Sequence, residues 1–115
     1  MSNNPKQTKF IFTSDGTTHD ATVSETTESI QSCYKYDWSV APIQSGLTVG
    51  DPTYTIEVSN DNITWFEYNN LSTDVSVEDA VDDNHLSWVW MRIVYDAGTE
   101  TTGTIEFELT QKQQA

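Results

Sequence analysis

The chain has 115 residues and a mass of 13.0 kDa, with five Lys and Arg against 18 Asp and Glu and a net charge of −13. This length fits one domain, and an aromatic content of 11% argues against a disordered chain. We expect no nucleic-acid partner, because phosphate binding needs clustered cations, and no membrane partner, because no segment approaches the roughly 18 apolar residues of a membrane helix.

Two of the few cations stand near the N-terminus. The first ten residues hold Lys6 and Lys9 and no acid, so residues 1–8 are predicted to form a polar arm, and Lys6 and Lys9 are predicted to bind an acidic partner. A terminus that is merely solubilised by two lysines is the alternative. The single cysteine, Cys33, leaves no internal disulfide, and the first residues lack a secretory signal. We therefore expect assembly in a cytoplasm.

The composition favours strands, because Thr, Val, Ile, Tyr and Trp recur and fit a pleated, half-buried surface. Turn residues, Pro42 among them, punctuate the chain at short intervals, which is typical of a sandwich or barrel. We expect eight strands in chain order at Lys9–Thr13, Ala21–Ser24, Ser29–Val40, Thr53–Ser59, Thr64–Tyr68, a short one at Val75 and Val77, Leu86–Tyr95 and Gly103–Thr110.

Alternation of apolar and polar residues is clearest in two of these segments. Thr53–Ser59 places Tyr54, Ile56 and Val58 on one face, and Gly103–Thr110 places Ile105, Phe107 and Leu109 on one face. Leu86–Tyr95 is apolar on both faces, which predicts a central strand covered on both sides. Glu106 and Glu108 on the last strand suggest a protected sheet edge. Ser76–Ala80 is the only candidate for a short helix.

The predicted fold is therefore all-β, an antiparallel two-sheet β-sandwich of about eight strands with a jelly-roll-like character. The domain organisation expected is an N-terminal arm at residues 1–8, one sandwich domain at 9–110 and a C-terminal tail at 111–115.

No motif for catalysis is recognised. Cys33, His19 and His85 are the candidate nucleophile and bases, and nothing around them resembles a known catalytic signature, so we expect no enzyme. Acidic turns at residues 60–62 and 82–85 offer oxygen ligands for calcium but lack the spacing of a calcium loop. We therefore expect no metal and no cofactor.

Trp88 and Trp90 lie two residues apart and so share one face of a strand. They are predicted to fill the core, and the alternative is a flat platform for a sugar ring; Trp38 and Trp65 have the same two interpretations. Arg92 is the only cation inside an apolar segment, which predicts a structural ion pair or, failing that, an outward interface residue.

Three sequence blocks, TYTIEVSNDNITWFEY (53–68), WVWMRIVY (88–95) and GTIEFEL (103–109), together with SIQSCYKYDWS (29–39), carry a resemblance. A strand ending in Ser-Asn-Asp, a Trp four residues later and an aromatic strand with Arg-Ile resemble discoidin-like, galactose-binding-like jelly rolls. They also resemble small β-sandwich virion proteins of tailed bacteriophages, and the likeness covers about residues 29–110. In these blocks the 60–62 turn would reverse a hairpin and Trp65 would cap the sandwich edge.

The phage resemblance implies a non-enzymatic structural protein located in the virion, which decorates or cements the capsid surface. Its partners would be the major capsid protein or other virion subunits, and the chain would form a homo-oligomer. Two alternatives remain open. One is a carbohydrate-binding module for host attachment, built on Trp88 and Trp90, and the other is a β-sandwich protein associated with the tail or neck.

Overall fold

A computed structural model describes residues 6–31, 36–48, 51–72, 81–83 and 89–113. They form ten strands in chain order: β1 (Lys6–Lys9), β2 (His19–Asp20), β3 (Glu25–Thr26), β4 (Ile30–Gln31), β5 (Tyr36–Ser45), β6 (Thr53–Ser59), β7 (Phe66–Ser72), β8 (Val81–Asp83), β9 (Trp90–Asp96) and β10 (Thr104–Gln113). The predictions at Val75, Val77 and Ser76–Ala80 lie outside the described residues.

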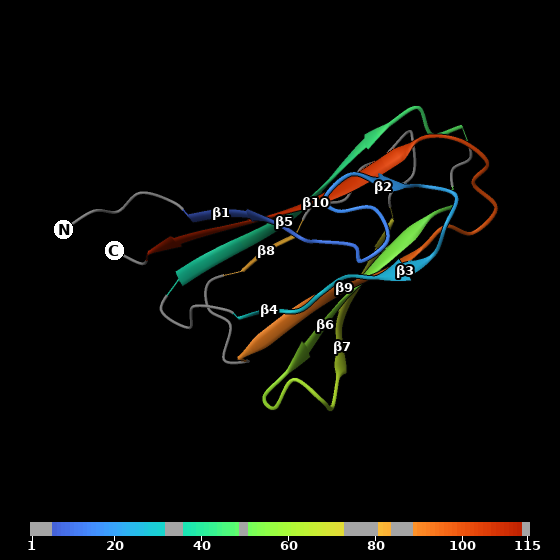
Figure 1. The fold of residues 1–115 in the computed structure, drawn as a ribbon. Coiled ribbons are helices and arrows are strands. Elements are labelled where there is room, and N and C mark those ends of the chain that lie inside the picture. The colour runs from blue at the N-terminus through green and yellow to red at the C-terminus, as the bar shows by residue number, and fades with distance from the viewer. Residues whose placement is uncertain (1–5, 32–35, 49–50, 73–80, 84–88, 114–115) are drawn as a thin grey trace.

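The strands make two five-stranded antiparallel sheets (Figure 1). The first has the order β1-β10-β5-β8, with β2 also paired to β10, and the second has the order β3-β9-β6-β7, with β4 also paired to β9. The predicted two-sheet β-sandwich is therefore confirmed.

The core lies between the two sheets. Phe107 on β10 packs against the second sheet, with ring centroids 4.7 Å from Tyr54 and 6.1 Å from Tyr95. Trp38 on β5 contacts Tyr68 on β7 edge to face at 5.6 Å. The aliphatic part of this core comprises Val40, Ile56, Val58, Met91, Ile93, Ile105 and Leu109, all buried.

The prediction for Thr53–Ser59 is confirmed with the same bounds, and Tyr54, Ile56 and Val58 are buried as expected. The last strand also alternates as predicted, with Phe107 among its buried residues. Its position differs, however, because β10 lies between β1 and β5 and is not an edge. The carboxylate of Glu106 accordingly pairs with Lys9 at the end of β1 instead of guarding a free edge.

The predicted strand Ser29–Val40 is wrong as a single element. Ile30–Gln31 forms β4 in the second sheet, whereas Tyr36–Ser45 forms β5 in the first. The apolar alternation continues through both because each strand turns one face to the same core. Alternation reports which face is buried and does not report which sheet a strand joins.

Pro42 lies inside β5 rather than in a turn, opposite Phe107 of β10. The carbonyl of Phe107 accepts a 3.0 Å hydrogen bond from the amide of Phe10, so the polar backbone groups of Phe107 point away from β5. The pair is thus of the non-hydrogen-bonded kind, in which the missing N–H of proline removes no ladder bond to β10.

The segment predicted as a fully covered strand, Leu86–Tyr95, contains β9 from Trp90 onward. This strand is central in its sheet, as expected, but only the face with Met91, Ile93 and Tyr95 is buried, and the other face is half-buried. The expectation of cover on both sides is therefore wrong, because the sandwich has two layers and no third layer lies over this face among the described residues.

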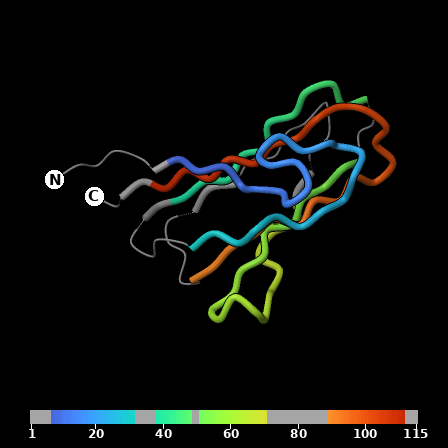
Figure 2. Tube along the Cα trace, viewed as in Figure 1, coloured from blue at the N-terminus to red at the C-terminus, as the bar shows by residue number. Residues whose placement is uncertain are grey.

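The strands at the N-terminus are shifted from the prediction. Strand β1 starts at Lys6 and ends at Lys9, so part of the predicted arm belongs to the first sheet, and β10 continues to Gln113 beside it (Figure 2). Phe10 and Phe12 follow β1 and are both buried. Residues 21–24, predicted as a strand, connect β2 in the first sheet to β3 in the second.

Candidate functional site

The β6–β7 loop, residues 60–65, is held by a compact set of local hydrogen bonds. The Ser59 hydroxyl donates to Oδ1 of Asp61 at 2.9 Å and accepts from the amides of Asp61 and Asn62 at 3.2 and 3.0 Å. Oδ1 of Asp61 also accepts from the amides of Ile63 and Thr64 at 2.9 and 2.8 Å. One hydroxyl and one carboxylate oxygen therefore fix the path of the loop.

The charge of Asp61 is stabilised by these donors, which lower the pKa of its carboxyl to about 2. Asn62 adopts a φ of 62°, in the left-handed region that Asn tolerates better than most residues. The acidic turn considered as a calcium ligand is thus used to build the turn itself.

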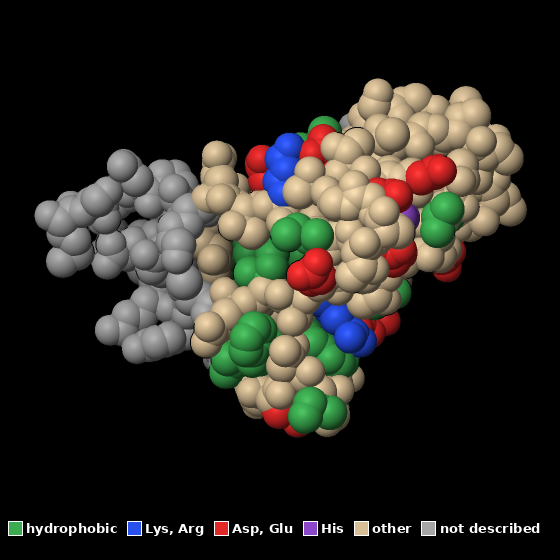
Figure 3. Space-filling model, in the orientation of Figure 1, with side chains coloured by type: hydrophobic (Ala, Val, Ile, Leu, Met, Phe, Trp, Pro, Cys, Tyr) green, Lys and Arg blue, Asp and Glu red, His purple; other side chains and the backbone are tan. Residues whose placement is uncertain are grey.

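Three exposed apolar side chains surround the end of β6 at this loop. Ile63 is 81% exposed, Phe66 is 52% exposed and Val89 is 38% exposed. Val58 near the end of β6 pairs with Phe66 of β7 on one side and with Met91 of β9 on the other, which places Phe66 and Val89 on either side of β6, at the end of the second sheet where the loop with Ile63 follows. We call Ile63, Phe66 and Val89 the end surface, and Figure 3 shows hydrophobic side chains exposed at this end, with other surface between them.

The outer face of the second sheet carries the predicted ion pair of Arg92. Nε of Arg92 donates to Oε1 of Glu57 at 2.8 Å across the β6–β9 pair. The guanidinium carbon lies 4.1 Å from the ring centroid of Trp65, a cation–π contact. The structural ion pair is therefore confirmed, and Trp65 lies half-buried against Arg92 outside the buried core.

Of the two lysines predicted to bind a partner, the structure describes the side chain of Lys9 only. Nζ of Lys9 lies 2.7 Å from Oε2 of Glu106, and this hydrogen-bonded acid raises the pKa of Lys9. Lys9 thus already has an intramolecular partner, although its side chain is 41% exposed. The side chain of Lys6 lies outside the described residues.

Trp88 and Trp90 were predicted to fill the core, with a sugar platform as the alternative, and only Trp90 is among the described residues. Trp90 on β9 is half-buried on the outer face of its sheet, so the core prediction is wrong for this residue. Trp38 is 2% exposed, as predicted for a core residue.

His19 is a core residue between the two sheets. Its ring stacks on Phe12 with centroids 4.0 Å apart and meets Tyr95 edge-on at 5.9 Å. Nε2 donates to the carbonyl of Val23 at 2.6 Å, and Nδ1 lies 2.6 Å from Oδ2 of Asp15, outside good hydrogen-bond alignment. These contacts give His19 a structural role. Cys33 and His85 lie outside the described residues.

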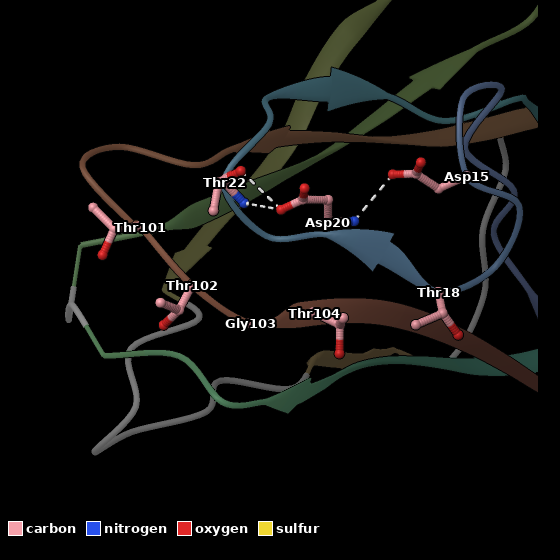
Figure 4. Close-up of a pocket in the computed structure, with 8 residues that line it drawn as sticks. All are labelled: Asp15, Thr18, Asp20, Thr22, Thr101, Thr102, Gly103 and Thr104. Atoms are coloured by element: carbon pink, nitrogen blue, oxygen red, sulfur yellow. Dashed lines mark hydrogen bonds between the residues drawn. The ribbon is translucent and has the colours of Figure 1, made fainter.

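An open depression of about 630 Å³ lies between the β2 region and the chain entering β10 (Figure 4). Its carboxylates are already engaged: Oδ1 of Asp20 accepts from the amide and hydroxyl of Thr22, and Oδ2 of Asp15 accepts from the amide of Asp20. The Thr22 bonds lower the pKa of Asp20. The lining is Asp15, Thr18, Asp20, Thr22, Thr101, Thr102, Gly103 and Thr104.

In the part of the chain that the structure describes, no group of three or more His, Cys, Asp or Glu is arranged to hold a metal ion. No helix with the length and apolarity needed to cross a membrane is found there either. Residues 82–85 form the second acidic turn that was considered for calcium. Only the backbone of Asp82 and Asp83 in β8 is described there.

The end surface was not predicted from the sequence. The one signal was an isolated isoleucine, Ile63, directly after the polar run at 60–62, because a turn between two strands rarely needs an apolar residue.

Compared with known proteins, the chain matches no family model, and no curated protein matches it.

Proposed function

We propose that this chain is a non-enzymatic structural subunit of a phage virion that binds the capsid surface as a decoration or cement protein. The observation that supports it best is the end surface, where Ile63, Phe66 and Val89 are exposed at one end of the second sheet, on a chain with a net charge of −13. Exposed apolar clusters with polar surroundings are typical of protein–protein contact sites.

The energetics fit a repeated, modest contact. Burying a large aliphatic or aromatic side chain contributes roughly 1.5–3 kcal/mol, so three such side chains support association without making an obligate interface. A capsid offers many copies of one site, and a homo-oligomer that engages several of them gains avidity. The anionic remainder of the surface would keep decorated particles soluble and apart.

The described titratable groups also support a structural role. Both ring nitrogens of His19 face groups of its own chain, and Arg92 and Lys9 are paired with Glu57 and Glu106. These side chains act in holding the sandwich together, as the proposal requires.

The test uses purified capsids of the phage whose genome encodes this sequence. Labelled chain is mixed with capsids and pelleted, and the complex is imaged by cryo-electron microscopy. The proposal predicts saturable binding at a fixed ratio to the major capsid protein, with density at symmetric positions on the shell. Absence from the pellet would contradict it. Density confined to the tail or neck would favour that alternative, and binding abolished by a soluble sugar would favour the carbohydrate-binding alternative.

A further inference from the structure

We infer that Ile63 is the anchor of the docking contact and that the partner presents an apolar pocket rimmed by Lys or Arg. This inference rests on the proposed function, because it names the chemistry of the partner for the same surface.

The loop is organised before binding. The side chains of Ser59 and Asp61 accept hydrogen bonds from the backbone amides of residues 61–64. The loop therefore has little conformational entropy left to lose on binding. A β-branched side chain such as Ile63 also has few rotamers to give up. Preorganisation of this kind increases affinity by lowering the cost of binding.

The turn itself gives no reason for an isoleucine. Ile63 contributes only its backbone amide to the hydrogen bonds that define the turn. Its side chain is 81% exposed. The loop therefore holds an apolar side chain in water at a fixed position. Phe66 and Val89 are exposed at the same end of the second sheet and add apolar surface to the contact that Ile63 would anchor.

The charges around the anchor are acidic. Asp61 is ionised in the loop, and Glu67 on β7 is exposed beside Glu57. The nearest described cation, Arg92, already contacts Glu57 and Trp65. A partner with cations around its pocket is complementary to this surface.

A second copy of this chain fits this surface poorly. Two-fold pairing through the end surface would bring Asp61 and Glu67 of one copy toward the same acids of the other copy. The occupant is therefore a different protein, and under the proposed function it is a capsid subunit.

The experiment compares Ile63→Ser with a matched control, Ile43→Ser, which removes an isoleucine that is 41% exposed on β5 of the other sheet. Both variants are checked by thermal unfolding and then titrated onto capsids in the pelleting assay. We expect at least tenfold weaker binding for Ile63→Ser and a change below twofold for Ile43→Ser. We also expect wild-type binding to weaken tenfold or more as NaCl rises from 50 to 500 mM.

The outcomes separate the two proposals. If the wild-type chain binds capsids and Ile63→Ser binds within twofold of it, the anchor is overturned and the proposed function stands. If wild-type binding is independent of salt, the cationic rim is overturned. If the wild-type chain does not bind capsids at all, the proposed function fails, and the inference fails with it.

Discussion

The hydroxyl of Tyr95 on β9 donates a 2.8 Å hydrogen bond to the carbonyl of Ala21, in the segment that connects the two sheets. Tyr95 is 1% exposed, and Ala21 is fully buried. Because a buried carbonyl that loses its donor costs roughly 1–3 kcal/mol, Tyr95→Phe should lower the free energy of unfolding by about 1–2 kcal/mol. Urea denaturation of the two proteins measures this, and equal stabilities would contradict it.

The same residue predicts an alkaline sensitivity. Burial, followed by the charges of Glu100 and Asp96, raises the pKa of Tyr95 well above its ordinary value of 10.0. The folded state therefore holds this proton more tightly than the unfolded state, and the associated stability is complete below pH 10 and lost as pH rises beyond it. Stability measured from pH 8 to 12 should fall more steeply for the wild-type chain than for Tyr95→Phe. Parallel curves would exclude this role.

Gly103, just before β10, has a φ of +99°, and a Cβ there would lie 2.7 Å from the carbonyl oxygen of Ser45. Gly16 offers a matched control, because its φ is +80° but nothing lies within 4 Å of a Cβ. Gly16→Ala should cost about 1 kcal/mol from backbone strain alone. Gly103→Ala should cost about 3 kcal/mol, because a backbone clash is added. Thermal unfolding compares them, and equal losses would contradict the clash.

Arg92, Glu57 and Trp65 form one coupled set on the outer face of the second sheet. A double-mutant cycle with Arg92→Met and Glu57→Gln should give a coupling energy of about 0.5–1 kcal/mol, since both partners are only partly exposed. Arg92→Lys should recover part of the charge interaction but lose the flat contact with Trp65. Tryptophan fluorescence follows that contact, and an unchanged spectrum in Arg92→Met would contradict it.

The sequence predicts features of this fold that depend on neighbouring residues, and it does not predict features that depend on residues far apart in the chain. Thr53–Ser59 was predicted with its bounds because alternation is a local property of one strand. The split of Ser29–Val40 into β4 and β5 and the central position of β10 were not, because strand pairing is set by residues far away in the chain. Glu106 illustrates this: its partner Lys9 is 97 residues away.

The site was harder to predict than the fold. The need of Arg92 for an acidic partner follows from its place in an apolar segment, but only the β6–β9 register identifies Glu57. The end surface joins a loop, the start of β7 and the residue before β9, so no single segment of sequence contains its signal. In the sequence, Asp61 is one acid in a polar turn. Its role in fixing the loop follows only from the hydrogen bonds that it accepts from the amides of Ile63 and Thr64.

Asp61 gives a prediction at acid pH. Its pKa is lowered from 3.8 to about 2 in the folded protein, so the carboxylate holds the loop above pH 4 and releases it as pH falls toward 2. The NMR amide shifts of Ile63 and Thr64 should titrate with a midpoint near pH 2. Asp61→Asn, which does not titrate, should remove this transition; its persistence in that variant would assign it to another group.

The proposed function places this chain on a phage capsid, so the most direct test of the account is a cryo-electron microscopy map of capsids assembled in the organism that supplies this sequence, saturated with the purified protein. We predict symmetric density on the shell, with the β6–β7 loop inserted into an apolar pocket bordered by Lys or Arg. Capsids without added density, or with the loop pointing into solvent, would contradict it.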